Sequence, residues 1–400
     1  MLRKSGTENG GASFLTNASF NGAHDKVLQL LTDVAPWDTR WHSMLKIDLR
    51  GRRADTLLRL NEFLPKLSEA LLDDNEIEYL TGLPSTLRYL SISRNRLPST
   101  AAFGHLENLE TLDVSENNID LRALRTLHQL KHLRANSNRI TTIEGIQDLE
   151  KLETLHLRGN GLDELEIQPG QWPCLRDLVL SHNRLSEVVG LGNLARLRSL
   201  NLDHNRLQDL DLGFTMPKLK QLRVSGNKYL SSLDVGPARN LRTLYADECS
   251  LKEVLNIGTL TKLDNLSLRQ QNGDGELQWP VHDTRDVKRL FLSGNAFPAV
   301  AIITPFFGLV YLELSGCQLT SLPGDLAMMV PNLRQLNADY NPLESLPPMN
   351  KMSRLKRFSL IGCRIDRSSK LIESLEGCEE LNLLDFRMNP CTLGLYPPII

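Results

Sequence analysis

Two neighbouring stretches, LRDLVLSHNRL (175–185) and LRSLNLDHNRL (197–207), decide the fold of this chain. They begin 22 residues apart, and both carry leucine at positions 1, 4, 6 and 11 and asparagine at position 9. This spacing does not follow one face of a helix. The leucines at positions 4 and 6 predict a short strand with both side chains on one face. The asparagine follows where the backbone turns, and its amide can bond the free peptide groups of that turn.

The asparagine position recurs as a ladder along most of the chain. Successive members lie 20 to 26 residues apart and define fifteen units, at Asn75, Asn95, Asn117, Asn138, Asn160, Asn183, Asn205, Asn227, Cys249, Gln271, Asn295, Cys317, Asn341, Cys363 and Asn389. A unit this small cannot bury its own apolar face, so the units must stack on one another.

The pattern is that of leucine-rich repeats. It predicts a leucine-rich-repeat solenoid of the α/β horseshoe class, with a concave parallel β-sheet of about 15–16 short strands. Each unit leaves only about a dozen residues for the return path, which is too few for a long helix. We therefore expect 3₁₀ turns and extended segments on the convex side.

The ends of the chain differ from the array. Residues 1–23 are rich in glycine, serine and asparagine and are expected to be disordered. Residues 24–58 are expected to form a cap, with a helix over DKVLQLLTD (25–33), Trp37, Trp41 and a degenerate first repeat. The array proper is placed at 59–391 and a C-terminal capping tail at 392–400. The ending Tyr-Pro-Pro-Ile-Ile is expected of a module cut from a longer protein.

Composition narrows the class of protein. With 46 basic and 48 acidic residues the net charge is −2, which argues against a nucleic-acid or membrane-surface binder. Neither an N-terminal signal nor an apolar run of membrane-spanning length is found. The six cysteines form no paired clusters, which favours reduced thiols in a cytosolic or nuclear protein that is not secreted. The three in the ladder are interpreted as small buried side chains.

Motifs of the common enzyme classes do not occur. The sequence contains no P-loop, no H-E-x-x-H and no G-x-S-x-G. His182 and His204 both occupy position 8 of adjacent repeats and should lie close together. A two-histidine metal site is one interpretation; turn residues facing solvent are the favoured one, because closed zinc sites use four ligands. We therefore expect a protein that is not an enzyme, without catalytic, cofactor-binding or metal-binding residues.

The outward positions of the sheet offer the natural binding surface of such a solenoid. In the middle-to-late repeats these positions carry aromatic side chains among charged ones, a composition typical of protein–protein interfaces. The predicted protein-binding residues on the concave face are Tyr245, Asp247, Arg269, Arg289, Phe291, Tyr311, Glu313 and Tyr340. The alternative is that neighbouring aromatics only cover one another across strands. The irregular run 268–290 is either a protruding binding loop or, as we favour, an ordinary return loop.

A second set of residues lies at position 2 of four successive repeats: Arg176, Arg198, Lys220 and Arg242. Such a column can bind phosphate or a phosphopeptide. The favoured interpretation is a solvated sheet edge, where charge also discourages pairing with another edge.

Several longer segments carry a more specific resemblance. They are MLKIDLRGR (44–52), FLPKLSEALLDDNEIEYLTGLPSTLRYLSISRNRL (63–97), HLENLETLDVSENNID (105–120), LRANSNRITTIEGI (133–146) and DFRMNPCTLGLYPP (385–398). Together they resemble the leucine-rich-repeat domain of the fungal spindle-pole-body scaffold of the mitotic-exit and septation-initiation networks, a family related to centriolin.

The resemblance implies a function in cell division. It implies a scaffold at the spindle pole body, in the cytoskeleton at the cytoplasmic or nuclear side. The balanced charge predicts no nucleic-acid and no membrane partner. The protein partners that it implies are a spindle-pole-body anchor protein, a Ras-like GTPase with its two-component GTPase-activating complex, and a Mob–kinase complex. No family motif assigns a binding residue here.

The sequence therefore predicts a non-enzymatic, protein-binding scaffold module that anchors or docks mitotic-exit and septation signalling proteins. Two alternatives remain: a phosphatase-regulatory leucine-rich-repeat subunit, and the sensor part of a larger enzyme.

Overall fold

The computed structural model describes residues 26–33, 41–272, 277, 287–297 and 305–394. The chain divides into two compact units, the first comprising residues 1–161 with 171–175 and the second residues 162–170 with 176–400. The predicted disordered segment 1–23, Trp37, residues 273–276 and 278–286 of the irregular run 268–290, and the last residues 395–400 lie outside the described residues.

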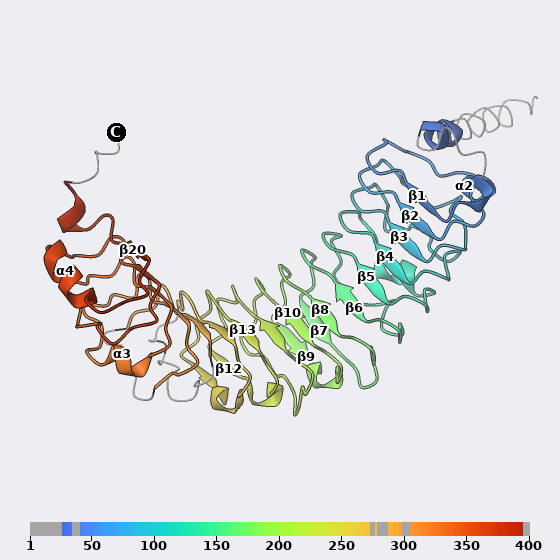
Figure 1. Ribbon diagram of the computed structural model, residues 1–400. Helices are drawn as coiled ribbons and strands as arrows, with labels where there is room; N and C mark the ends of the chain where they lie inside the picture. Colours follow the sequence, from blue (N-terminus) through green and yellow to red (C-terminus); the bar gives the residue numbers. More distant parts are fainter. Residues whose placement is uncertain (1–25, 34–40, 273–276, 278–286, 298–304, 395–400) are drawn as a thin grey trace, which may run out of the picture. The chain divides into compact units, whose positions relative to one another are not determined.

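Six parallel strands form the sheet of the first unit, each contributed by one repeat (Figure 1). In chain order they are β1 (Lys46–Asp48), β2 (Glu69–Leu71), β3 (Tyr89–Ser91), β4 (Thr111–Asp113), β5 (His132–Arg134) and β6 (Thr154–His156). Neighbours pair in register, so that for example Leu112 lies opposite Leu133. The middle residue of each strand is buried, and the flanking residues face outward.

Ten parallel strands form the corresponding sheet of the second unit. They are β8 (Asp177–Val179), β10 (Ser199–Asn201), β11 (Gln221–Arg223), β13 (Thr243–Tyr245), β15 (Asn265–Ser267), β16 (Arg289–Phe291), β17 (Tyr311–Glu313), β18 (Gln335–Asn337), β19 (Arg357–Ser359) and β20 (Leu383–Asp385). With the six strands of the first unit they make sixteen. The prediction of 15–16 short parallel strands is therefore confirmed, including a strand in the degenerate opening repeat.

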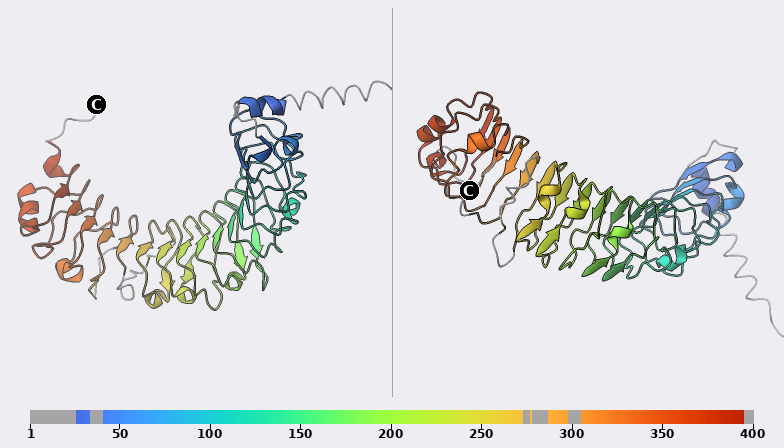
Figure 2. Two further views of the ribbon diagram at one scale, coloured as in Figure 1. Left: turned by 45° about the vertical axis from the view of Figure 1, so that its right-hand side comes forward. Right: turned by 90° about the horizontal axis from the view of Figure 1, so that it is seen from below.

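The return segments are mostly short turns and extended chain, as predicted. The 3₁₀ turns are η1 (Trp41–Ser43), η2 (Leu121–Leu124), η3 (Leu191–Asn193), η4 (Gly236–Ala238), η5 (Ile257–Thr259) and η6 (Pro390–Thr392). The described α-helices with bounds inside the array are α2 (Leu60–Phe63), α3 (Leu326–Met329) and α4 (Ser368–Leu375). In the second unit η4, η5 and α3 lie on the side away from the sheet (Figure 2, yellow and orange).

Two small sheets on the return side were not predicted. β7 (Glu164–Glu166) pairs with β9 (Glu187–Val189), and β12 (Ser232–Asp234) pairs with β14 (Glu253–Leu255). Both pairs are parallel and belong to the second unit. In these repeats the extended return segments therefore add backbone hydrogen bonds of their own.

The ladder residues hold successive repeats together through their amides. The Oδ1 of Asn160 accepts from the N–H groups of Asn138 (2.9 Å) and Ile140 (3.0 Å) in the preceding repeat. Its Nδ2 donates to the carbonyls of Ala135 and Leu157, each at 2.9 Å. One buried amide thereby satisfies peptide groups that the turn would otherwise leave without partners.

Glutamine and cysteine take over part of this function. Gln271 accepts from the N–H of Leu251 (3.0 Å) and donates to the carbonyl of Ala246 (2.8 Å). Cys249 donates from Sγ to the carbonyl of Val224 (3.3 Å). Burial raises the pKa of Cys249 to about 12 and that of Cys317 to about 11, so these thiols stay protonated and serve as small ladder side chains.

Residues 26–33, before the first strand, are helical. Val27 and Leu31 are buried, and the Lys26 ammonium lies 2.5 Å from the carboxylate of Asp55. Trp41 packs edge-on against Phe63, with ring centroids 6.3 Å apart. The helix thus covers apolar surface of the opening repeats. The limits proposed for the cap (24–58), the array (59–391) and the tail remain predictions.

Candidate functional site

Five of the eight predicted binding residues form one connected group on the sheet of the second unit: Asp247, Arg269, Phe291, Tyr311 and Glu313. We call these five the aromatic–charge cluster. Phe291 ends β16, and Tyr311 and Glu313 begin and end β17. Asp247 and Arg269 each follow their strand by two residues, where outward position 7 falls. Alternation along the strands therefore brings residues from four successive repeats onto one face.

The Arg269 guanidinium connects the repeat of β15 to that of β17, two strands further along the sheet. Its Nε and Nη2 donate to the two carboxylate oxygens of Glu313 at 2.9 and 3.0 Å. The Ser293 hydroxyl donates to the same carboxylate at 2.6 Å. Burial opposes ionisation of Glu313, but the hydrogen bonds from Arg269 and Ser293 outweigh it, and the pKa of Glu313 lies below its usual range.

The aromatic rings of the cluster lie against this ion pair. The Arg269 guanidinium is 4.6 Å from the centre of the Phe291 ring, and the Phe291 and Tyr311 rings are 5.0 Å apart and tilted by 41°. The Tyr311 hydroxyl donates to Glu313 at 3.0 Å. Burial, followed by the nearby Glu313 charge, raises the pKa of Tyr311 to about 12, so the phenol is neutral at physiological pH. Phe291 and Tyr311 do cover one another in part, and both remain half-exposed.

Asp247 has a local structural function. Its carboxylate accepts from the Ser267 hydroxyl (2.5 Å) and from the N–H of Arg269 (2.8 Å) in the next repeat. Asp339 accepts in the same way from Ser359 (2.6 Å) and from the N–H of Ile361 (2.7 Å). An aspartate at position 7 therefore connects its repeat to the next one. These hydrogen bonds account for an aspartate at position 247 without a partner protein.

Tyr245 lies two strands away from Phe291 in the same sheet. In the sheet register Ser267 separates it from Phe291. The Arg223 guanidinium stands 5.1 Å from the centre of the Tyr245 ring, and its Nε donates to Asp203 at 2.7 Å. This arrangement repeats the Arg269–Phe291 pair two repeats earlier. Arg223 is thus a contributor to the surface that the sequence analysis did not select.

Arg289 and Tyr340 complete the predicted set at its exposed margin. Arg289 begins β16 and pairs in register with Tyr311. Tyr340 is 60% exposed, and its φ of 54° places it in the left-handed region. Its ring packs over Gly362, where an added Cβ would lie 2.7 Å from the tyrosine Cδ1. The glycine allows the ring to lie on the next repeat, with its outer face open.

The histidine rings predicted to adjoin one another do so. His182 and His204 are stacked, with centroids 4.4 Å apart and an interplanar angle of 22°. In the part of the chain that the structure describes, no group of three or more histidine, cysteine or carboxylate side chains could hold a metal ion. No helix among the described residues has the length and apolar character needed to cross a membrane.

Comparisons with known proteins agree with this geometry. Residues 128–169 and 195–235 match the family model of leucine-rich repeats in two copies, and residues 105–127 match a single leucine-rich repeat. The functional domain of InlJ from Listeria monocytogenes has a similar structure, with a TM-score of 0.69 and 22% identity over 84% of this chain and 72% of that one. The chain has the leucine-rich-repeat fold, and the predicted fold class is confirmed.

Two curated relatives extend along almost the whole chain. The septation initiation network scaffold protein cdc11 of Schizosaccharomyces pombe is 36% identical over 382 residues, which are 95% of this chain and 36% of that protein. Protein NUD1 of Saccharomyces cerevisiae is 27% identical over 94% of this chain and 42% of its own length. The chain thus spans well under half of either relative. It is a leucine-rich-repeat domain related to the septation scaffold, as the sequence resemblance predicted.

Proposed function

We propose that this chain is the non-enzymatic docking domain of a scaffold that holds mitotic-exit and septation signalling proteins at the spindle pole body. The observation that carries the proposal is the 36% identity to the septation initiation network scaffold protein cdc11 over 95% of the chain. The leucine-rich-repeat fold supports it, because stacked repeats present an extended surface that suits protein recognition.

The partners that we propose are those that the sequence resemblance implies. They are a spindle-pole-body anchor protein, a Ras-like GTPase with its two-component GTPase-activating complex, and a Mob–kinase complex. The domain places them near one another and takes no part in their chemistry.

The aromatic–charge cluster, together with Tyr245, Arg289 and Tyr340, is the proposed protein-binding surface. Its Arg269–Glu313 pair is already satisfied within the sheet, so it holds the Phe291 and Tyr311 rings in fixed positions. A rigid aromatic surface loses little conformational entropy on binding, which favours affinity. Arg289 and Tyr340 supply the exposed charge and ring at its margin.

Binding of each purified partner to the whole chain tests both parts of the proposal. At least one of the proposed partners should bind stably, and replacing Tyr245, Phe291 and Tyr340 by alanine should weaken that binding by about tenfold or more, as loss of aromatic interface residues does. Tyr229→Ala is the matched control, because Tyr229 is an exposed tyrosine of the second unit that lies in a turn after the ladder.

Two outcomes would contradict the proposal in different ways. Full affinity of the triple alanine variant would place the interface elsewhere on the domain and leave the scaffold function standing. Stable capture of a phosphatase catalytic subunit, without affinity for any of the proposed partners, would instead favour a phosphatase-regulatory subunit.

A further inference from the structure

The residue directly before each sheet strand forms a surface column whose charge pattern differs between the two units. In the first unit Arg88, Glu110 and Lys131 alternate in sign. Glu110 accepts from Lys131 at 2.6 Å and also from Arg88. Both cations hold the pKa of Glu110 below its usual range, with Lys131 the larger influence. Here neighbouring repeats compensate one another's charge.

In the second unit the same column is positive in four successive repeats, at Arg176, Arg198, Lys220 and Arg242. Backbone bonds from Lys220 N–H to the Arg198 carbonyl and from Arg242 N–H to the Lys220 carbonyl, each 2.8 Å, set these residues one strand spacing apart. The run ends at Asp264, which pairs with Lys288 at 2.6 Å. Arg198, Lys220 and Arg242 stand on neighbouring strands about 4.8 Å apart, and their like charges repel one another, so an anion bound between them is favourable.

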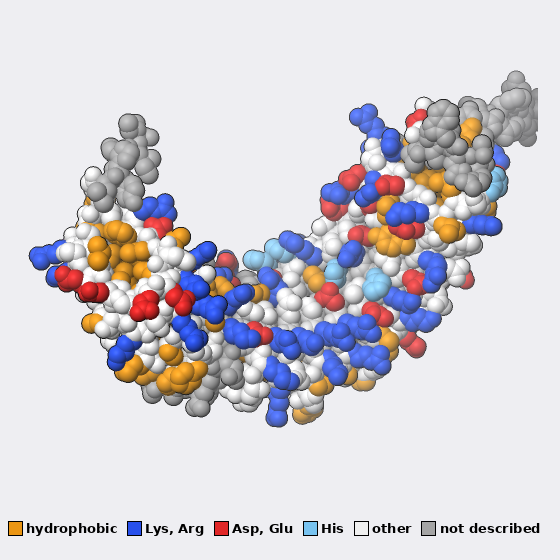
Figure 3. Space-filling model, viewed as in Figure 1, with side chains coloured by type: hydrophobic (Ala, Val, Ile, Leu, Met, Phe, Trp, Pro, Cys, Tyr) orange, Lys and Arg blue, Asp and Glu red, His pale blue; other side chains and the backbone are white. Residues whose placement is uncertain are grey.

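A second row of cations deepens this column into a groove. Arg198, Lys218, Lys220, Arg242 and Lys262 line a cavity of about 280 Å³ with Pro217 and Asn240, and no carboxylate contributes to its lining. We call these five cations the basic groove. All five are exposed. Among the described residues, no carboxylate forms an ion pair with Arg198, Lys218, Lys220 or Arg242. Figure 3 shows Lys and Arg side chains gathered in a row over the second unit.

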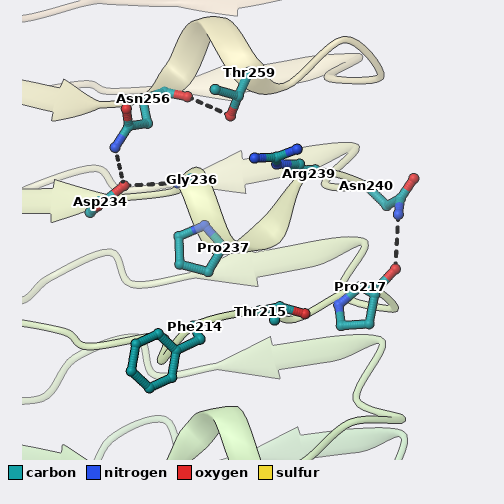
Figure 4. A pocket seen from close by; sticks show the side chains of 10 residues that line it. All are labelled: Phe214, Thr215, Pro217, Asp234, Gly236, Pro237, Arg239, Asn240, Asn256 and Thr259. Carbon is teal, nitrogen blue, oxygen red and sulfur yellow. Dashed lines mark hydrogen bonds between the residues drawn. The ribbon is translucent and has the colours of Figure 1, made fainter.

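A hollow with both apolar and polar walls, the Asp234 carboxylate among them, adjoins the basic groove. Its volume is about 580 Å³, and Phe214, Pro217 and Pro237 contribute rings to its walls (Figure 4). We call it the Phe214 pocket. Pro217 and Asn240 line both the pocket and the groove. Asn240 fixes this shared wall, because its Nδ2 donates to the Pro217 carbonyl (2.9 Å) and its Oδ1 accepts from Lys262 (2.7 Å).

The exposure of Phe214 follows from the backbone before it. Gly213 has a φ of 73°, and a Cβ at this position would lie 2.9 Å from the Cα of Gly192 in the preceding repeat. The close approach of these two return loops leaves the following Phe214 side chain entirely in solvent. A fully exposed phenylalanine in the wall of a hollow is a suitable anchor for an apolar partner side chain.

The combination of groove and pocket selects among anionic partners. Single-stranded nucleic acid stacks successive bases on several aromatic rings, whereas the linings of the groove and the pocket together contain one aromatic ring, that of Phe214, which disfavours it. A peptide can supply negative charges and an apolar side chain on one strand. Phosphate carries a charge near −2 and three acceptor oxygens, so one group can bridge two adjacent cations of the column, whereas a carboxylate brings a single charge.

We propose that the basic groove and the Phe214 pocket form a docking site for a phosphorylated peptide segment of a partner protein. The peptide lies extended, places phosphorylated side chains at alternate positions against Arg198, Lys220 and Arg242, and inserts an apolar side chain beside Phe214. This site is separate from the aromatic–charge cluster and does not depend on the function proposed for it.

Fluorescence anisotropy with the whole chain and a short labelled alanine-based peptide tests this proposal. The probe carries one leucine and two phosphoserines at alternate positions, and it is compared with versions bearing serine or glutamate instead. The phosphorylated peptide should bind about tenfold or more tightly than the serine peptide and several-fold more tightly than the glutamate peptide. Equal affinity for the glutamate peptide, or absence of binding, would overturn the proposal.

Charge and apolar variants locate the site. Lys220→Glu introduces the alternation already present at Arg88, Glu110 and Lys131, so folding should be preserved while phosphopeptide affinity falls about tenfold or more. Lys252→Glu makes the same charge change at an exposed lysine after the ladder turn and should leave affinity nearly unchanged. Phe214→Ala should weaken the leucine-containing phosphopeptide several-fold. Equal losses for Lys220→Glu and Lys252→Glu, or tighter binding of a single-stranded oligonucleotide or an anionic vesicle, would contradict the proposal.

Discussion

The residue before each ladder position has a backbone conformation that most side chains avoid. All fifteen of these residues have positive φ: Asp74, Arg94, Glu116, Ser137, Gly159, His182, His204, Gly226, Glu248, Gln270, Gly294, Gly316, Tyr340, Gly362 and Met388. Only five are glycine, which adopts this region without a steric penalty. The turn is therefore imposed by stacking and by the ladder amide, and position 8 is a turn position that happens to face outward.

Replacing a non-glycine residue at position 8 by glycine should stabilise the fold. Glu248 has a φ of 53° and an exposed side chain, and its N–H bond to the Arg269 carbonyl (2.9 Å) does not depend on the side chain. Glu248→Gly should raise the free energy of unfolding by about 0.5–1 kcal/mol in urea denaturation. Glu253→Gly, in the extended strand β14, is the control and should lower it by a similar amount. A loss of stability in both variants would mean that position 8 is not strained.

The Arg269–Glu313 pair should make stability depend on pH. The pKa of Glu313 is lowered in the folded chain, so its contribution is present above the ordinary value of 4.5 and is lost as pH falls through the lower folded value. Glu313→Gln should cost about 1–3 kcal/mol at neutral pH, since it removes charged hydrogen bonds. The gap between wild type and variant in urea midpoint should narrow in acid. If the difference in urea midpoint between wild type and variant is the same at neutral and at acidic pH, the carboxylate charge contributes nothing to stability.

At the scale of elements, the sequence predicted the features that are set within a single repeat. It missed the strand pairs that form between the return segments of two repeats. Leu197, Leu200, Leu202 and Leu207 occupy the core as the spacing implied, because each position is defined within its own unit. The paired return strands β7 and β9 were missed, because three-residue runs such as Glu187–Val189 carry no periodic signal of their own.

In the candidate binding surface, too, the sequence predicted the orientation of single residues but not the contacts between repeats. Strand alternation placed Tyr245, Phe291 and Tyr311 outward, as predicted. It could not show that Arg269 reaches Glu313, 44 residues away in sequence, since that contact depends on side-chain length and rotamer across an intervening strand. Nor could it show that Asp247 is used to tie two repeats together. The position of a residue in the repeat predicts which face of the sheet it lies on. Only the contacts in three dimensions show which polar groups bind within the fold and which remain available to a partner.

Substitution of a ladder residue should cost the most stability where a buried asparagine amide makes hydrogen bonds with both its oxygen and its nitrogen. Asn341 is almost fully buried, accepts from the N–H groups of Cys317 (2.9 Å) and Leu319 (3.0 Å), and donates to the Leu314 carbonyl (2.8 Å). Asn341→Ala leaves several buried peptide groups without partners and should cost about 3 kcal/mol. Cys363→Ala removes only thiol contacts of 3.4 Å or more and should cost about 1 kcal/mol. If urea denaturation gives Asn341→Ala and Cys363→Ala a similar loss of free energy of unfolding, the asparagine amide contributes no more to stability than the cysteine thiol.

At the scale of the whole molecule, stability in a repeat array is built from contacts between neighbours. Each described sheet strand pairs only with strands of adjacent repeats, and each ladder amide reaches the repeat before its own. Such arrays behave approximately as chains of nearest-neighbour interactions. Damage to one repeat should therefore spread over a few repeats and then fade.

Hydrogen exchange of the Asn341→Ala variant tests this expectation. Amides around the altered ladder position, from β17 through β19, should exchange faster than in the wild type, because local opening there costs less free energy. Amides of β3, β4 and β5 in the first unit should keep their wild-type rates, since none of them contacts the altered repeat. Cys363→Ala should give the same distribution with smaller changes. A uniform increase along the chain would instead mean that all the repeats open together, and that a defect at any ladder position weakens every binding surface of the domain equally.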